Sequence, residues 1–75
     1  MDLKLVHEVL KRHLKGRTVE DDTPLVSGGL IDSMAIVDLI VDLEDAVGVR
    51  IPASEVQQDD FDTPRKIAQT VSRFR

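Results

Sequence analysis

Cysteine is absent from this sequence, and its absence removes several kinds of chemistry. Without thiols the chain forms no disulfide, no thiolate nucleophile and no cysteine-rich zinc site. The absence also fits a reducing compartment, so we expect a cytoplasmic protein. Long apolar runs are missing as well, because no stretch approaches the roughly 20 apolar residues that span a bilayer, and no secretory signal follows Met1. We therefore expect no membrane insertion.

Basic residues are almost missing from the middle of the chain. Residues 18–62 contain twelve acidic residues and one basic residue, Arg50, although the whole chain has a net charge of only -4. An acidic middle repels phosphates, so we expect no nucleic-acid partner. It favours a partner with a basic surface, unless the acidic residues serve solubility alone.

Length and composition describe a small folded protein. The chain has 75 residues, of which 41% are hydrophobic. This is enough for one domain over residues 1–75 with a modest core, but not for a large pocket beside that core. We expect a monomer of limited stability.

Three segments have the apolar spacing of amphipathic helices. The first is predicted over residues 2–15, where Asp2 is a suitable cap and Gly16 a suitable stop. The last begins at Thr63 and Pro64, a hydroxyl N-cap followed by proline, and continues toward the chain end. Their apolar faces carry Leu3, Val6, Leu10 and Leu14, and Ile67, Val71 and Phe74, respectively.

The second helix is predicted over Ser33–Val47 and ends at Gly48. Its apolar face carries Ile36, Leu39, Ile40, Leu43 and Val47. An acidic stripe lies almost opposite, made of Asp38, Asp42 and Asp45, of which Asp38 and Asp42 are expected to be exposed. A further apolar line beside these acids is more than a small bundle needs and is typical of a docking surface; it consists of Met34, Val37 and Val41.

The segments between the helices complete the predicted fold. Residues 17–32 have no periodicity and form a long loop, which Leu25 and Leu30 should hold against the core. Residues 49–52 are extended, and a short irregular helix is predicted near residues 57–61. The fold class is all-α: a small four-helix bundle with three main helices and a short third helix before the last one.

The residues of this chain do not support catalysis or metal binding. A serine nucleophile needs a positioned base, and the only histidines, His7 and His13, suit structural or solvated roles on the first helix. The hydrolase pattern G-x-S-x-G does not surround Ser33. A calcium loop counted from Asp59 would require glycine at the position of Pro64, so the match fails. We expect no enzyme activity and no metal.

Ser33 allows two interpretations. Either Asp32 or Ser33 could cap the second helix, which is the ordinary role of such residues at this position. Alternatively, Ser33 is a place where a group is attached, because it follows a glycine-containing loop and stands at a helix N-terminus, which favours a phosphate.

The segment GLIDSMAIVDLIVDLE, from Gly29 to Glu44, resembles acyl carrier proteins and the related peptidyl and D-alanyl carrier proteins. The resemblance covers nearly the whole chain, including the Ile51-Pro52 and Phe61-Asp62-Thr63-Pro64 elements. It implies that Ser33 receives 4'-phosphopantetheine from coenzyme A, and that a thiol at the end of this arm holds acyl or aminoacyl groups as thioesters.

The resemblance also implies roles for the neighbours of Ser33. Asp32 matches the acid that the phosphopantetheinyl transferase recognises, and Met34 matches a hydrophobic residue that helps to dock partner enzymes. These partners would be the transferase, a loading ligase and downstream transferases. The second helix would present the remaining docking residues to basic partner surfaces: Val37, Asp38, Val41, Asp42, Glu44 and Asp45.

Some positions depart from the patterns of particular subfamilies. Ala35 replaces the second acid of the Asp-Ser-Leu-Asp pattern of fatty-acid carriers. Peptidyl carriers often have Gly-Gly-x-Ser, whereas here Asp32 precedes the serine and Gly28-Gly29 lie earlier in the chain. Pro-Ala-Ser-Glu-Val from Pro52 is similar to D-alanyl carriers and to stand-alone carriers with an adenylating ligase. We expect a discrete carrier of unspecified cargo; the alternative is an acidic helical interaction module without the arm.

Overall fold

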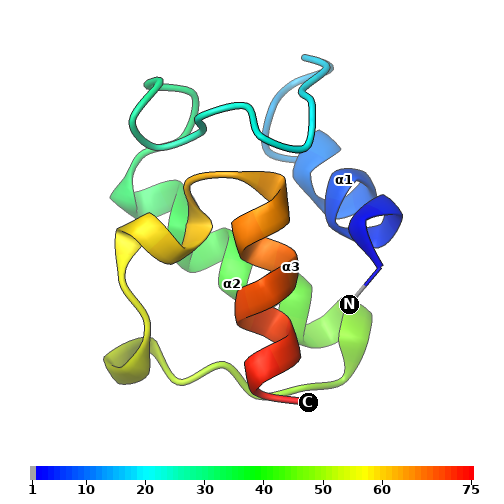
Figure 1. Ribbon diagram of the computed structural model, residues 1–75, viewed down its shortest axis with the longest axis vertical. Coiled ribbons are helices and arrows are strands. Elements are labelled where there is room, and N and C mark those ends of the chain that lie inside the picture. The colour runs from blue at the N-terminus through cyan, green and yellow to red at the C-terminus, as the bar shows by residue number, and fades with distance from the viewer. Residues whose placement is uncertain (1) are drawn as a thin grey trace.

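The computed structural model describes residues 2–75 and contains three α-helices. These are α1 (Leu3–Lys11), α2 (Ser33–Val47) and α3 (Pro64–Arg73), and the 3-10 helices η1 (Ala53–Glu55) and η2 (Gln58–Phe61) lie between α2 and α3 (Figure 1). Within residues 2–75 there is no strand. The predicted all-α fold is confirmed, although the short helix before α3 is two 3-10 turns.

The first helix is shorter than predicted. The Asp2 carboxylate caps α1 by accepting a hydrogen bond from the Lys4 amide, as expected. The α-helix ends at Lys11 rather than at residue 15, because the following residues form turns and both Lys15 and Gly16 have positive φ. Leu14 is nevertheless buried, so the predicted apolar face is correct.

The second helix has both predicted ends. Asp32 precedes it in extended conformation, and Gly48 ends it in the left-handed region with φ of 75°. That conformation is accessible to glycine at little cost and lets the Gly48 amide donate to the Glu44 carbonyl. The segment after it, residues 49–52, stays a single extended stretch; its Ile51 is buried, and the Ile51 amide donates to the Glu44 carboxylate at 2.7 Å.

The third helix begins as predicted. The Thr63 hydroxyl accepts a hydrogen bond from the Lys66 amide, and Pro64 occupies the first turn. Of its predicted apolar face, Ile67 and Val71 are fully buried, whereas Phe74 is half-buried at the C-cap.

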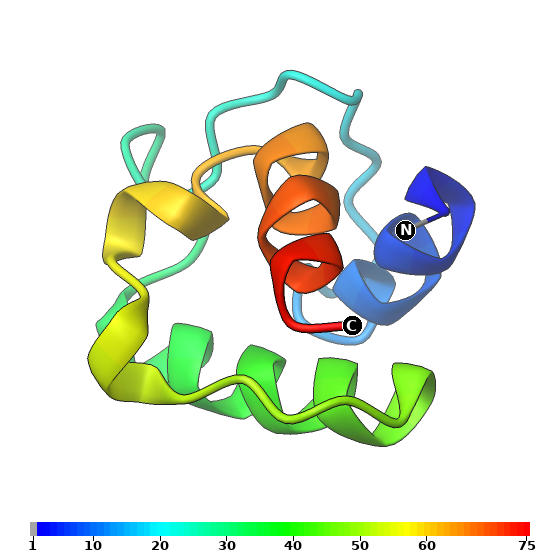
Figure 2. The ribbon, with the colours of Figure 1, turned by 60° about the horizontal axis from the view of Figure 1, so that its bottom comes forward.

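The core lies between α2 and the pair formed by α1 and α3. Figure 2 shows α2 on one side of this pair and the long loop, residues 17–32, passing over the opposite side. Phe61 of η2 is the largest fully buried side chain and fills the core beside α2 and α3. Leu25 is fully buried and Leu30 packs against the core, so both predicted anchors of the loop are confirmed.

Candidate functional site

Ser33 is the first residue of α2, and its side chain is exposed. The cap is formed by its neighbour, because the Asp32 carboxylate accepts a hydrogen bond of 2.8 Å from the Ala35 amide. No group within residues 2–75 makes a hydrogen bond with the Ser33 hydroxyl. The choice between the two possible caps is therefore settled in favour of Asp32, and the hydroxyl of Ser33 is available for chemistry.

The loop before Ser33 closes into a tight turn. The carbonyl oxygen of Leu25 accepts hydrogen bonds from the amides of Leu30 at 2.8 Å and Ile31 at 3.0 Å. Gly28 is required by this closure, because a Cβ at that position would lie 2.2 Å from the carbonyl oxygen of Pro24. Gly29 follows with a φ of +76°, which side chains disfavour. The turn places the buried Ile31 directly before the cap of α2.

The outer face of α2 exposes the predicted apolar line. Met34 is 76% exposed, Val37 60% and Val41 50%, which are large values for apolar side chains on a folded helix. Asp38 and Asp45 are exposed too, and neither makes an ion pair with any group within residues 2–75. A partner would therefore meet an apolar strip with free negative charge beside it.

Two other acids of α2 are engaged inside the molecule. The Asp42 carboxylate forms a hydrogen bond of 2.7 Å with the His13 ring and is only partly exposed. The expectation that Asp42 is as exposed as Asp38 is therefore wrong. Glu44 binds the Ile51 amide. No local sequence pattern indicates the first contact, because its partners lie 29 positions apart in the chain. The structural role expected for His13 is the one observed.

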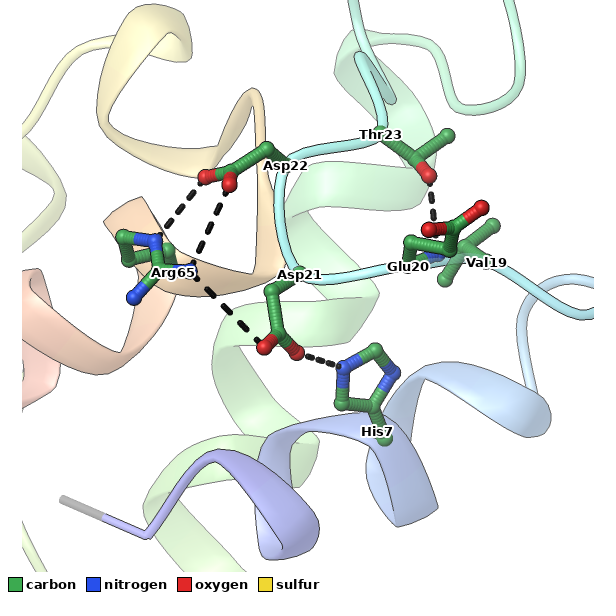
Figure 3. Close-up of a pocket in the computed structure, with 7 residues that line it drawn as sticks. All are labelled: His7, Val19, Glu20, Asp21, Asp22, Thr23 and Arg65. Carbon is green, nitrogen blue, oxygen red and sulfur yellow. Dashed lines mark hydrogen bonds and ion pairs between the residues drawn. The ribbon is translucent and has the colours of Figure 1, made fainter.

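A charged cluster outside this face fastens the beginning of the loop (Figure 3). The Arg65 side chain donates to Asp22, with Nε 2.9 Å from Oδ1, and His7 lies 2.8 Å from Asp21. The hydrogen bond from Arg65 is the main reason that the pKa of Asp22 lies below its usual value. The same pair raises the pKa of Arg65. These residues line an open hollow, but their charges are paired within the cluster, which is the pattern of a structural contact.

The acids once compared with a calcium loop have separate roles. Asp60 accepts from the Gln57 amide, Asp59 pairs with Lys66, and Asp62 reaches the long loop. None of these contacts was predicted; the position of Asp62 before the helix start Thr63-Pro64 was visible in the sequence, but its partner was not.

No helix within residues 2–75 combines the length and apolar character that crossing a membrane requires.

Comparison with known proteins shows the family to which the chain belongs. Residues 3–71 match the family model described as the phosphopantetheine attachment site. The chain belongs to this family of carriers. The carrier is similar to the D-alanyl carrier protein of Leuconostoc mesenteroides, with 36% identity over 73 residues that cover 95% of this chain and 94% of the relative.

Other relatives carry the same name. The D-alanyl carrier protein of Streptococcus sanguinis is 34% identical over 73 residues, which cover 97% of this chain and 89% of the relative. That of Streptococcus gordonii is 43% identical over 54 residues, 72% of this chain and 68% of the relative. The resemblance drawn from the sequence is thereby confirmed. Proteins of this kind are carriers rather than enzymes, and the cofactor that they carry covalently is 4'-phosphopantetheine.

The geometry of the carrier around Ser33 fits that group. A phosphodiester on the Ser33 oxygen would stand at the N-terminus of a 15-residue helix, where the helix dipole favours negative charge. The amides of Ser33 and Met34 donate to no group within residues 2–75, so they are free to face an anion. The arm would leave the surface directly, because Ser33 is exposed.

Proposed function

We propose that this carrier tethers acyl or aminoacyl groups as thioesters on a 4'-phosphopantetheine arm attached to Ser33, and presents them to partner enzymes. The observation that carries the proposal is the exposed Ser33 hydroxyl without a hydrogen-bond partner among residues 2–75, beside a helix cap that Asp32 already supplies. The match of residues 3–71 to the attachment-site family supports it.

Attachment forms one bond and breaks another. The Ser33 oxygen attacks the phosphorus next to the pantetheine part of coenzyme A, losing its proton, and adenosine 3',5'-bisphosphate departs. The phosphopantetheinyl transferase would supply the base, because within residues 2–75 neither His7 nor His13 makes a hydrogen bond with Ser33: their ring nitrogens contact Asp21 and Asp42. We propose that the exposed carboxylate of Asp32 is part of what the transferase recognises.

The arm, when attached, supplies a thiol on which a cargo is held as a thioester. The protein then acts by bringing that cargo to a docked enzyme at high effective concentration. We propose that Met34, Val37 and Val41 contact the partner. The carboxylates of Asp38 and Asp45 would attract basic residues around that contact and so guide the partner to it. Asp42 contributes less, since His13 already binds it. Such contacts must be short-lived, because the carrier has to leave after each step.

The names of the relatives support one class of cargo. Because several relatives are named D-alanyl carrier proteins, we propose an aminoacyl cargo, with D-alanine first among the candidates. The loading enzyme would then be an adenylating ligase. The matched residues cover 94% of the Leuconostoc relative. A monomer in the cytoplasm remains our prediction.

Attachment is tested by intact mass spectrometry. Wild-type protein is incubated with coenzyme A and a broad-specificity phosphopantetheinyl transferase, and it should gain the mass of one phosphopantetheine group. Ser33→Ala should gain nothing, whereas the matched control Ser54→Ala, which changes another exposed serine, should be modified like the wild type. An unmodified wild type, or an equal gain on Ser33→Ala, contradicts the proposal. The mass of the thioester on protein purified from its source cell identifies the cargo.

A further inference from the structure

Asp62 binds the long loop from the junction between η2 and α3. Its carboxylate Oδ1 accepts hydrogen bonds from the backbone amides of Val26 at 2.9 Å and Ser27 at 2.8 Å. The Ser27 hydroxyl donates to the other oxygen, Oδ2, at 2.9 Å. The Asp62 carbonyl oxygen accepts from the Leu25 amide at 2.5 Å. One residue therefore holds three consecutive residues of a loop that lies more than thirty positions away in the chain.

The residues that Asp62 holds lead directly to Ser33. Leu25, whose amide binds the Asp62 carbonyl, uses its own carbonyl to accept from Leu30 and Ile31. Ile31 is buried in the core, and Asp32 after it caps α2. An unbroken series of hydrogen bonds and adjacent residues thus connects the start of α3 to the attachment serine.

Asp62 is suited to this contact in its ionised form. The hydrogen bond from the Ser27 amide is the main cause that holds the pKa of Asp62 below its usual value, and the Ser27 hydroxyl and the Val26 amide act in the same direction. A carboxylate accepts such bonds more strongly than a neutral group does. The contact is therefore intact at neutral pH.

The beginning of the loop has a separate attachment. Arg65 binds Asp22 through its side chain, and its amide donates to the Asp21 carbonyl at 2.9 Å. His7 binds the Asp21 carboxylate. Loss of the Asp62 contact would therefore loosen the turn at residues 25–31 while the loop remains fastened at residues 21–22, which predicts a local change rather than unfolding.

We propose that Asp62 is a positioning residue for modification of Ser33: by fixing the turn at residues 25–31 it holds Ser33 in the orientation that the transferase needs. This inference rests on the proposed attachment at Ser33. Within residues 2–75, Asp62 makes no hydrogen bond or ion pair with Ser33 or with the exposed residues of α2, so it acts through the loop. A reacting group displaced by about 1 Å can slow a reaction by two orders of magnitude, so a loosened turn is sufficient to lower the rate.

The test compares Asp62→Asn and Asp59→Asn with the wild-type chain in steady-state modification by the transferase. Both changes remove one negative charge from the same segment, but Asp59 pairs with Lys66 and does not reach the loop. We expect Asp62→Asn to lower kcat about ten-fold with little change in KM for the carrier, because the apolar docking strip is untouched. Asp59→Asn should match the wild type.

The division between kcat and KM separates positioning from simple loss of stability. A variant that is merely partly unfolded supplies less competent carrier, which raises the apparent KM and leaves kcat unchanged. Hydrogen exchange gives a second measurement: in Asp62→Asn, the amides of Val26, Ser27 and Ile31 should exchange faster while those in the middle of α2 keep their protection.

Two results overturn the inference. The first is an Asp62→Asn variant that matches the wild type in both kcat and KM, and the second is a loss that lies in KM alone; either result assigns Asp62 a purely structural role. Asp62→Ala, which removes both acceptor oxygens, should be slower still. If that variant does not fold, Asp62→Asn decides the matter. Failure of the proposed attachment is distinct, because the wild type itself would then remain unmodified.

Discussion

At the scale of single residues, either Asp32 or Ser33 could have capped α2, and Asp32 is the one that does. The Asp32 carboxylate accepts a hydrogen bond from the Ala35 amide at the start of α2, and the Ser33 hydroxyl makes no hydrogen bond with any group within residues 2–75. The helix cap and the proposed attachment therefore use different side chains. The serine is free to change chemically without loosening the helix that displays it.

This division predicts different effects of substitution on folding. Asp32→Ala removes the cap and should lower the free energy of unfolding by about 1 kcal/mol, whereas Asp32→Asn, whose amide oxygen can still accept, should lose much less. Ser33→Ala should be close to neutral, since it removes no observed bond. Urea denaturation followed by circular dichroism measures all three. A Ser33→Ala variant as unstable as Asp32→Ala would show that the hydroxyl does cap the helix.

At the scale of elements, α2 has an inner face that builds the core and an outer face that meets solvent. The inner face contains Ile36, Leu39, Ile40 and Leu43. The outer face joins exposed apolar side chains to Asp38 and Asp45, while Asp42 binds His13 in the turn that follows α1. Charge reversal at Asp38 therefore tests docking, whereas reversal at Asp42 would also break the contact between α2 and that turn.

Reversal of Asp38 should slow transfer to or from a partner enzyme. We expect Asp38→Lys to reduce the transfer rate about three- to ten-fold at low salt, because it replaces a steering charge with a repelling one. The difference from wild type should shrink at about 1 M salt, where screening is strong. Glu8→Lys, an equal charge change at an exposed site on α1, is the control. Equal transfer rates for Asp38→Lys and Glu8→Lys would show that Asp38 has no specific role in docking.

Local signals in the sequence predicted the elements with strong end residues. Asp32 and Gly48 marked the two ends of α2, and Thr63-Pro64 marked the start of α3. Such ends can be predicted because cap residues and helix breakers affect the backbone of only the few residues next to them. The end of α1 was missed, since the pattern continues to Leu14 while the backbone has already left the helix. The contacts of Asp62 and Asp42 join distant segments, and no local pattern encodes such a pair. The place of Ser33 at the start of α2 was predictable; the residues that hold the loop before it were not.

At the scale of the whole molecule, ion pairs and carboxylate hydrogen bonds tie the loop to α1 and α3. Asp22 and Asp62 both have lowered pKa values, through Arg65 and through the Ser27 amide respectively. A carboxyl whose pKa is lower in the folded state stabilises that state above its unfolded pKa, and the contribution disappears as the pH falls through the folded value. The loop contacts should therefore weaken in acid.

Acid titration of stability isolates the contribution of Asp62. Wild type should be more stable than Asp62→Asn at pH 6, and the difference should diminish below about pH 4 as the carboxyl takes up its proton. Chemical denaturation at a series of pH values gives the two curves. Curves that remain parallel throughout the acid range would mean that ionisation of Asp62 does not stabilise the fold.

The loop and the outer face of α2 lie on opposite sides of the molecule, as Figure 2 shows. Residues 18–20 of that loop include the exposed side chains of Thr18 and Glu20. A fluorophore or a surface linker attached there would leave the face bearing Ser33 and its apolar neighbours open to incoming enzymes. The architecture thus provides a place from which the carrier can be observed or immobilised while it works.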